Sequence, residues 1–329
     1  MKETILLTGG AGYIGSHINI LLKENGYPTI ILDNLSNGHK EFIIDSIFYH
    51  CDSGNVDMLD FIFSENRISA VVHLAAFAYV GESLSHPERY YSNNVSNTIN
   101  LLKVMRKYGV NKIVFSSTCA TYGEQEVQPI QEGSSQHPIN PYGNSKFMAE
   151  TIIKDYSEAY GFNYSILRYF NAAGADPSCR LGEWHDPEPH LIPIILDVAI
   201  GVREKLDIFG DDYDTPDGTC IRDYVHVSDL AEAHQLTLED LLQNCRSSTY
   251  NLGSERGFSI LDVIHTVEKV SKKKIKTRVV DRRYGDPDTL IGSSEKIQKE
   301  LQWKPKYMGL EAIIGTAWDW HKKLYELYK

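Results

Sequence analysis

The sequence predicts an α/β protein whose parallel sheet is wound with helices on both faces, followed by a smaller α/β C-terminal part. Short apolar strands alternate with amphipathic helices over residues 4–169, and this alternation is typical of a doubly wound parallel sheet. A glycine-rich turn joins the first strand to the first helix. The alternation ends in a stretch rich in Gly, Pro and Asp, residues 174–190. We place an approximate boundary there, between domains 1–173 and 174–329, and allow the chain to cross back between them.

The composition is that of an ordinary globular protein. With 42 % hydrophobic and 23 % charged residues among 329, the chain is long enough to bury a large core. A formal net charge of −11 argues against nucleic acid and anionic membranes as partners, and no apolar run approaches the ~20 residues of a membrane helix. The five cysteines are scattered without a CxxC pair, and no signal peptide is recognisable. We therefore expect a cytoplasmic protein with reduced thiols and no metal site.

The first strand, residues 4–8, leads into a glycine-rich turn and then into a helix over residues 16–24. The turn fits a GxxGxxG spacing from Gly9 and a GxGxxG spacing from Gly10, so spacing alone does not choose a subtype. Glycines let the backbone approach a pyrophosphate closely, and the N-terminus of the following helix offers unpaired N–H groups to it. We expect a Rossmann-type dinucleotide site that includes Gly9, Gly12, Tyr13, Ile14 and Gly15.

The next three strands, over residues 29–32, 47–50 and 70–74, carry candidate cofactor contacts at their carboxyl ends. Asp33 ends the first of them. A carboxylate there accepts hydrogen bonds from the adenosine ribose and repels a 2′-phosphate, which favours NAD over NADP. Asp52 follows the second strand, within reach of the adenine amino group. The further cofactor candidates at these strand ends are Asn34, Ser53, Leu74, Ala75 and Ala76.

A long helix is predicted over residues 88–108, although Asn94 lies inside it. Asparagine is a poor interior helix residue unless its amide has a partner. A strand over residues 112–115 then runs into the hydroxyl-rich sequence SSTCAT, which begins at Ser116 and includes Thr118. Because parallel α/β sheets place their chemistry at carboxyl strand ends, these hydroxyls are candidates for contact with a ligand.

Tyr142 and Lys146 open the next helix, which is predicted over residues 142–160. Side chains four residues apart lie on one helix face, so the ammonium group can favour the phenolate and let a weak acid act as a base near neutral pH. This spacing is common on surface helices, and its surroundings must decide whether it is functional. The strand that follows, residues 165–169, ends at Tyr169.

Shorter elements predict a second, smaller α/β unit beyond residue 190. An acidic turn over residues 210–218 divides it. The predicted helices cover residues 191–201, 228–241 and 259–271, and the predicted strands cover residues 206–209 and 275–280.

Five motifs, TGGAGYIGSH, SSTCATYG, YGNSK, RYFNAAGA and IRDYVHVSDLA, occur in this order and together resemble those of UDP-glucose 4-epimerases of the extended short-chain dehydrogenase/reductase family. The resemblance runs from residue 4 to about residue 305. It implies bound NAD and a UDP-sugar substrate. It also makes Tyr142 the catalytic base, Lys146 the catalytic lysine and Thr118 the catalytic hydroxyl. The cofactor contacts that it adds are Asn94, Ser116, Tyr142, Lys146 and Tyr169.

The same resemblance implies a substrate site built mainly from the second half of the chain. It places Asn171, Arg222 and Arg283 at the pyrophosphate, where bidentate guanidinium groups suit a protein of net negative charge. Leu290 matches the position that limits the sugar pocket: a bulky Tyr there excludes N-acetylated sugars, and Leu is intermediate in size. The further substrate candidates are Thr118, Tyr142, His190, Leu191, Phe209, Tyr224 and Asp286.

The resemblance implies interconversion of UDP-glucose and UDP-galactose through a transient 4-keto sugar, with UDP-N-acetylglucosamine and UDP-N-acetylgalactosamine as further candidates. Thr118 in place of Ser, Ala78 in place of Lys and His190 in place of Asn bring the sequence closer to a group that includes UDP-pentose (xylose/arabinose) 4-epimerases, which is the alternative. Nucleotide-sugar 4,6-dehydratases and decarboxylases need carboxylates next to the strand-end hydroxyl, where Cys119 and Ala120 stand instead. A non-catalytic NAD-binding regulator would have lost part of the catalytic triad, which is complete.

Two predicted helices, 88–108 and 142–160, carry apolar side chains on more than one face. In the resembled family the equivalent pair forms a four-helix interface between two subunits. The resemblance therefore implies a homodimer.

Overall fold

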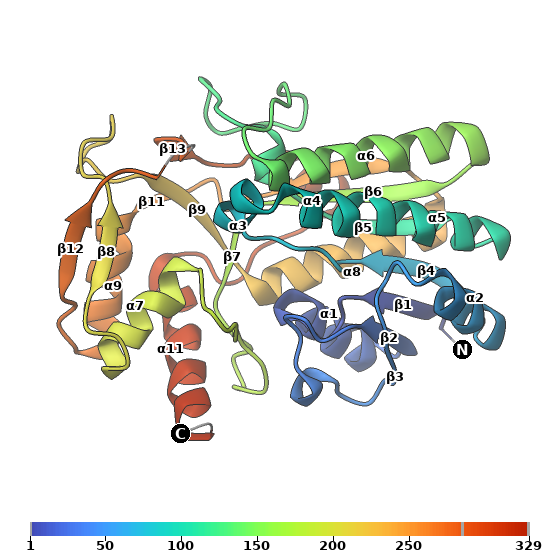
Figure 1. Cartoon of the computed structure of the whole chain (residues 1–329), viewed down its shortest axis with the longest axis horizontal. Helices are drawn as coiled ribbons and strands as arrows, with labels where there is room; N and C mark the ends of the chain where they lie inside the picture. Colours follow the sequence, from blue (N-terminus) through green and yellow to red (C-terminus); the bar gives the residue numbers. More distant parts are fainter. Residues whose placement is uncertain (1, 284–285, 328–329) are drawn as a thin grey trace.

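The centre of the protein is a seven-stranded parallel sheet with the strand order β10-β6-β5-β4-β1-β2-β3 (Figure 1). It is seen in a computed structural model that describes residues 2–283 and 286–327. The strand order reverses between β1 and β4, which is where open α/β sheets bind their ligands. The doubly wound fold class predicted from the sequence is thereby confirmed. The strands are β1 (Thr4–Thr8), β2 (Thr29–Asp33), β3 (Ile47–His50), β4 (Ile68–His73), β5 (Lys112–Thr118), β6 (Asn163–Tyr169) and β10 (Ser248–Leu252).

Helices cover both faces of this sheet because its strands are apolar on both sides. On β1, Ile5 and Leu7 belong to the core cluster shared with α1 and α8, whereas Leu6 belongs to the cluster shared with α2, α5 and α6. All three side chains are fully buried, as expected for a parallel sheet with two covered faces. Figure 1 shows α5 and α6 on one side of the sheet and α1 and α8 on the other. These helices are α1 (Tyr13–Glu24), α2 (Val56–Glu65), α5 (Asn97–Lys107), α6 (Pro141–Tyr160) and α8 (Val227–Asn244).

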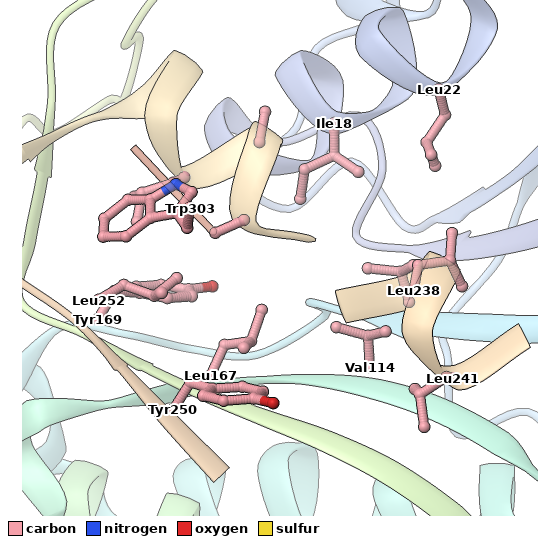
Figure 2. Packing of buried hydrophobic residues seen from close by; sticks show 14 of the residues in the cluster. Ile18, Leu22, Val114, Leu167, Tyr169, Leu238, Leu241, Tyr250, Leu252 and Trp303 are labelled. Atoms are coloured by element: carbon pink, nitrogen blue, oxygen red, sulfur yellow. The ribbon is translucent and has the colours of Figure 1, made fainter. Parts of the chain in front are cut away.

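The chain returns to the large sheet after residue 174. Strand β10 pairs with β6, so that Ser248 lies opposite Ser165 and Leu252 opposite Tyr169, and α8 packs on the same sheet. Figure 2 shows Trp303 in this core with Leu252 and Tyr169, and its indole N–H donates to the Asp229 carbonyl oxygen at 3.0 Å. The division into domains 1–173 and 174–329 stays a proposal, but α8, β10 and Trp303 belong spatially with the first of them.

The remaining elements form a smaller unit beside the carboxyl ends of the large sheet. Its main sheet centres on β9, and β8 and β12 form a two-stranded sheet. Helices α7, α9 and α11 share one core cluster. The strands are β7 (Asn171–Ala173), β8 (Leu206–Phe209), β9 (Ile221–His226), β11 (Gly257–Ser259), β12 (Thr277–Val280) and β13 (Thr289–Leu290), and the helices are α7 (Leu191–Ile200), α9 (Ile260–Ser271) and α11 (Leu310–Leu327). Helix α10 (Glu295–Leu301) instead packs against β10 and α8 of the large sheet.

The long helix predicted over residues 88–108 is helical throughout but not regular. It consists of α4 (Pro87–Tyr90), a π-helical segment (Tyr91–Ser96) and α5. The reason is Asn94, whose amide oxygen accepts from the Phe77 N–H at 2.9 Å and whose amide nitrogen donates to the Phe77 carbonyl and to Ser145 Oγ. The widened turn lets Asn94 fasten the loop after β4 to helix α6, and π segments of this kind are common at functional sites. The other short helices are α3 (Val80–Ser85), η1 (Lys40–Phe42) and η3 (Cys119–Thr121).

The composition predicted that the chain has no membrane span and that its cysteines are reduced. Within the part of the chain that the structure describes, no helix combines the length and the apolar character that a membrane crossing requires. The five cysteines are free thiols, and Cys119 and Cys220 are buried.

Candidate active site

A cavity of about 1010 Å³ opens between the carboxyl ends of the large sheet and the smaller unit. Every substrate candidate from the sequence lines this cavity. All cofactor candidates line it as well, except Asp52 and Asn94. The structure thus brings together residues that are up to about 280 positions apart in sequence, from Gly9 to Leu290. Their individual roles remain proposals.

The glycine turn forms one end of the cavity. A Cβ atom on Gly15 would lie 2.3 Å from the Gly9 carbonyl oxygen, and one on Gly9 would lie 2.7 Å from the Ala75 nitrogen. Only glycine therefore fits at both positions. Gly12 precedes α1, and no side chain caps this helix. The first N–H groups of α1 are thus available to an anion, which fits the pyrophosphate of a dinucleotide.

Asp33 stands at the end of β2 beside this turn. Its carboxylate oxygens accept from the N–H groups of Ala11 at 3.0 Å and Leu35 at 2.8 Å. Burial raises the pKa of Asp33, and these two hydrogen bonds oppose the shift. The carboxylate is therefore held at the cavity edge in the position that suits a ribose. Asp52, by contrast, lies outside the cavity lining, because its oxygens accept from Asn34, from the Gly54 N–H and from Asn97.

Tyr142, Lys146 and Thr118 meet where β5 ends against the first turns of α6. Burial raises the pKa of Tyr142 to about 12, and a hydrogen bond with Thr118 opposes the shift. Lys146 donates to the Ser116 carbonyl oxygen at 2.7 Å, and burial lowers its pKa to about 7. The sequence led us to expect a lowered tyrosine pKa. In this structure burial dominates instead, and the ammonium group is directed to the strand.

A buried ion pair lies one turn further along α6. The Arg168 guanidinium donates to both carboxylate oxygens of Glu150, from Nε at 2.9 Å and from Nη2 at 2.6 Å. Ser117 donates to the same carboxylate, and Arg168 also donates to the Tyr122 hydroxyl at 2.8 Å. Glu150 and Arg168 are 0 % and 2 % exposed. The negative charge of Glu150 raises the pKa of Lys146 against the effect of burial, so Glu150 supports the charge of the lysine.

The opposite wall carries the cationic groups. Arg222 lies 3.5 Å from Asp286 and donates to the Pro287 carbonyl oxygen at 2.8 Å. The Arg283 guanidinium covers the Phe209 ring at 3.8 Å from its centroid. Both arginines line the cavity, where they can meet an anionic group despite the net charge of −11. The remaining substrate candidates on or next to this wall are Asn171, His190, Leu191, Tyr224 and Leu290.

Sequence reasoning missed three further lining residues, Glu183, His185 and Glu188, which gather around His190. They lie in the stretch that the sequence analysis treated only as a domain boundary. The signal was present as alternating Glu and His in GEWHDPEPH. Glu150 and Arg168 were missed as well, although a carboxylate four residues after Lys146 on a buried helix face is a comparable signal.

Comparison with known proteins agrees with this geometry. Residues 5–253 match the NAD dependent epimerase/dehydratase family. A UDP-glucose 4-epimerase from Halalkalibacterium halodurans is 52 % identical over 319 residues, which cover 97 % of this chain and 96 % of the relative. A crystal structure of UDP-glucose 4-epimerase from Brucella ovis in complex with NAD is 43 % identical and superposes with a TM-score of 0.94 over 97 % of this chain and 98 % of that one.

A second solved structure, UDP-glucose 4-epimerase from Bifidobacterium longum in complex with NAD+ and UDP, is 37 % identical with a TM-score of 0.93. The match covers 97 % of this chain and 98 % of the other. Sequence and fold thus agree over nearly the whole length of these proteins. The chain belongs to the NAD-dependent epimerase/dehydratase family, and within it to the UDP-glucose 4-epimerases.

Proposed function

We propose that this protein interconverts UDP-glucose and UDP-galactose by inverting C4 of the sugar, with NAD as its cofactor. The observation that carries the proposal is the meeting of Tyr142, Lys146 and Thr118 in one cavity with the glycine turn at one end and two arginines at the other. A dinucleotide and a nucleotide sugar both need such a cavity, and the three side chains supply proton transfer at the point between them.

The residues at the glycine turn fit NAD. The tight approach of Gly9 and Gly15, the uncapped start of α1 and the fixed Asp33 carboxylate match a pyrophosphate and an unphosphorylated ribose. When bound, NAD supplies reversible hydride transfer at C4, by way of a transient 4-keto sugar, so that no net oxidation occurs. The task of the protein is to orient the sugar, to exclude water and to move one proton.

Tyr142 is the group that we assign to the proton of the sugar 4-hydroxyl. It takes this proton when C4 is oxidised and returns it when C4 is reduced. Its pKa of about 12 must fall for this step, and Lys146, one helical turn away, is the cation placed to lower it. Thr118 shares a hydrogen bond with Tyr142 and is placed to bind the same 4-oxygen. Arg222 and Arg283 hold the pyrophosphate while the keto sugar turns over.

A coupled assay tests this function. Protein supplemented with NAD is mixed with UDP-galactose, and the UDP-glucose formed is oxidised by a UDP-glucose dehydrogenase. We expect continuous turnover. Absence of turnover in folded, NAD-supplemented protein, with UDP-arabinose converted in a parallel reaction, would replace the hexose assignment by the pentose alternative. A nucleotide-sugar 4,6-dehydratase or decarboxylase would form the 4-epimer of neither substrate. Such an enzyme also needs an acid and a base beside the strand-end hydroxyl, and Cys119 and Ala120 beside Thr118 cannot supply them.

Leu290 is proposed to set which sugars fit. It lines the cavity, is 9 % exposed and packs with Cys119, Tyr122 and Phe170. We expect the wild type to convert UDP-N-acetylgalactosamine, and Leu290→Tyr to lower kcat/KM for that substrate at least about 10-fold more than for UDP-galactose, because the larger ring fills the space for the acetyl group. Leu290→Met, of similar volume, is the control. Equal rates for wild type and Leu290→Tyr on the N-acetyl sugar, or none from either, would reject this role.

We also propose a homodimer that resides in the cytoplasm. Helix α6 exposes Met148 (41 %) and Tyr160 (46 %), and α5 lies beside it (Figure 1). A second copy of this helix pair would cover these side chains. Light scattering is expected to give the mass of two chains at micromolar concentration, and the mass of one chain would contradict the proposal.

A further inference from the structure

We propose that Glu183, His185, Glu188 and His190 bind one divalent transition-metal ion, with zinc as the first candidate. Their four donor atoms lie within 4.8 Å of one another, although the composition led us to expect no metal site. The inference does not depend on the proposed function, because it concerns the wall of the cavity and not the reaction.

The separations of the donor atoms suit a tetrahedral ion. His190 Nδ1 lies 2.7 Å from Glu183 Oε1 and 3.0 Å from Glu188 Oε1, and His185 Nδ1 lies 3.3 Å from Glu188 Oε2 and 3.6 Å from Glu183 Oε1. Zinc binds imidazole nitrogen and carboxylate oxygen at about 2.0–2.2 Å, which puts tetrahedral donors roughly 3.4 Å apart. These four nitrogen–oxygen distances bracket this value, and all donor atoms lie within 4.8 Å of one another, so side-chain rotations would bring all four donors onto one ion.

Charge and donor type narrow the identity of the ion. Within the described part of the chain, neither Glu183 nor Glu188 forms an ion pair with a lysine or an arginine. Both imidazoles must be neutral to coordinate an ion, and the ligand set then carries a charge of −2, which a divalent cation neutralises. The two carboxylates raise the pKa of His190 to about 10, so its proton leaves when the ion binds. A set of two nitrogens and two oxygens favours zinc and its neighbours, whereas Ca²⁺ and Mg²⁺ prefer oxygen alone and Cu(I) prefers sulfur.

The surrounding side chains hold the ligands in place. The Trp184 ring stacks on His39 at 3.7 Å between centroids, and the Trp320 indole N–H donates to the Glu183 carbonyl oxygen at 2.9 Å. The Tyr79 ring packs edge-on against both His185 and His190, at 6.1 and 6.0 Å. These contacts tie the ligand segment to residues near the large sheet and to α11. A site that needs little rearrangement of its backbone loses little affinity to ordering.

The arrangement indicates a structural ion and not a reacting one. Four protein ligands leave no open position for substrate or water, which is typical of structural zinc sites. His190 immediately precedes α7, and Tyr79 follows the loop after β4. Because all four ligands lie between residues 183 and 190, the ion would fix the loop that leads into α7, and the contacts of both imidazoles with Tyr79 join this loop to the other wall of the cavity.

Metal content of the whole protein tests the site. Three proteins are compared: wild type, His185→Ala and the control His265→Ala. Each is purified with a tag that lacks histidine, incubated with ZnCl₂ and dialysed, and its zinc content is then measured by elemental mass spectrometry. His265 is an exposed histidine on α9, far in sequence from the cluster. We expect one zinc per chain in wild type and control, and an affinity lowered at least about 10- to 100-fold in His185→Ala. Glu188→Gln replaces His185→Ala if the latter does not fold.

Cobalt(II) supplies a signature that adventitious binding does not give. Visible absorption bands of tetrahedral cobalt are expected in wild type and in His265→Ala and absent from His185→Ala, and zinc should raise Tm of the first two proteins only. Substoichiometric zinc in wild type, or equal metal content in wild type and His185→Ala, would overturn the proposal and leave the cluster as two pairs of imidazole and carboxylate.

Discussion

Tyr142→Phe is expected to lower kcat for the conversion of UDP-galactose about 10²- to 10⁴-fold, the range that a positioned acid–base group contributes. The phenol is the group that can take the proton of the sugar 4-hydroxyl. Among the cavity residues that the structure describes, no other hydroxyl combines a bond to Thr118 with a lysine one turn away on the same helix. The ring itself packs edge-on against Tyr90 at 6.4 Å, and phenylalanine preserves that contact. Binding of UDP, measured by calorimetry, should therefore change little.

The matched control is Tyr160→Phe, which removes a hydroxyl from the far end of the same helix. Tyr160 is 46 % exposed and lies outside the cavity lining. The Tyr160→Phe variant should convert UDP-galactose with the kcat of the wild type. A Tyr142→Phe variant that retained more than about a tenth of the wild-type kcat would show that another group moves the proton.

Glu150→Gln is expected to lower the free energy of unfolding by about 3–5 kcal/mol. Removing one partner of a buried pair leaves the other charge without compensation, and this is far more costly than removing both. Glu150 and Arg168 are buried against β5 and β6, and the carboxylate accepts both arms of the guanidinium. Urea unfolding followed by circular dichroism measures the change. Glu311→Gln, at an exposed pair with Lys269, is the control and should cost less than about 1 kcal/mol.

A double variant separates stability from catalysis. Glu150→Gln with Arg168→Met removes both charges and should recover most of the lost stability. It still lacks the negative charge that raises the pKa of Lys146, so the pKa of this lysine falls further below its unfolded value of about 10.5. The ammonium form is then lost at lower pH, and the alkaline limb of kcat/KM should move to lower pH in the single and the double variant alike. Recovery of stability together with a wild-type pH profile would exclude this influence of Glu150 on Lys146.

The sequence predicted the first six strands of the large sheet because each is a short apolar run between turn residues. It did not predict β9, whose sequence IRDYVH interrupts an apolar run with charges. The Asp223 carboxylate in this strand is fully buried and is satisfied by the N–H groups of Ser254 at 2.8 Å and Gly292 at 3.1 Å. Partners that lie about 30 and 70 residues away cannot be inferred from periodicity.

The candidate site was predictable where one chain segment supplies both the geometry and the chemistry. The glycine turn with its helix, and Tyr142 with Lys146, are segments of this kind. The pairing of Glu150 with Arg168 could not be predicted from the sequence, because it depends on how α6 packs against β6. The raised pKa of Tyr142 could not be predicted either, because local spacing shows which charge is near but not how deeply the phenol is buried.

The return of the chain to the large sheet has a consequence for biosynthesis. Six strands of the sheet are synthesised before residue 170, but β10 ends only at Leu252. Trp303, which fills the core beside Leu252 and Tyr169, is synthesised later still (Figure 2). Until then β6 is an open edge with unpaired N–H and carbonyl groups, and the face later covered by α8 exposes apolar side chains. The large sheet is thus completed only after about three quarters of the chain has been made, and the nascent chain depends on protection of that edge while the roughly 80 residues between β6 and β10 are synthesised.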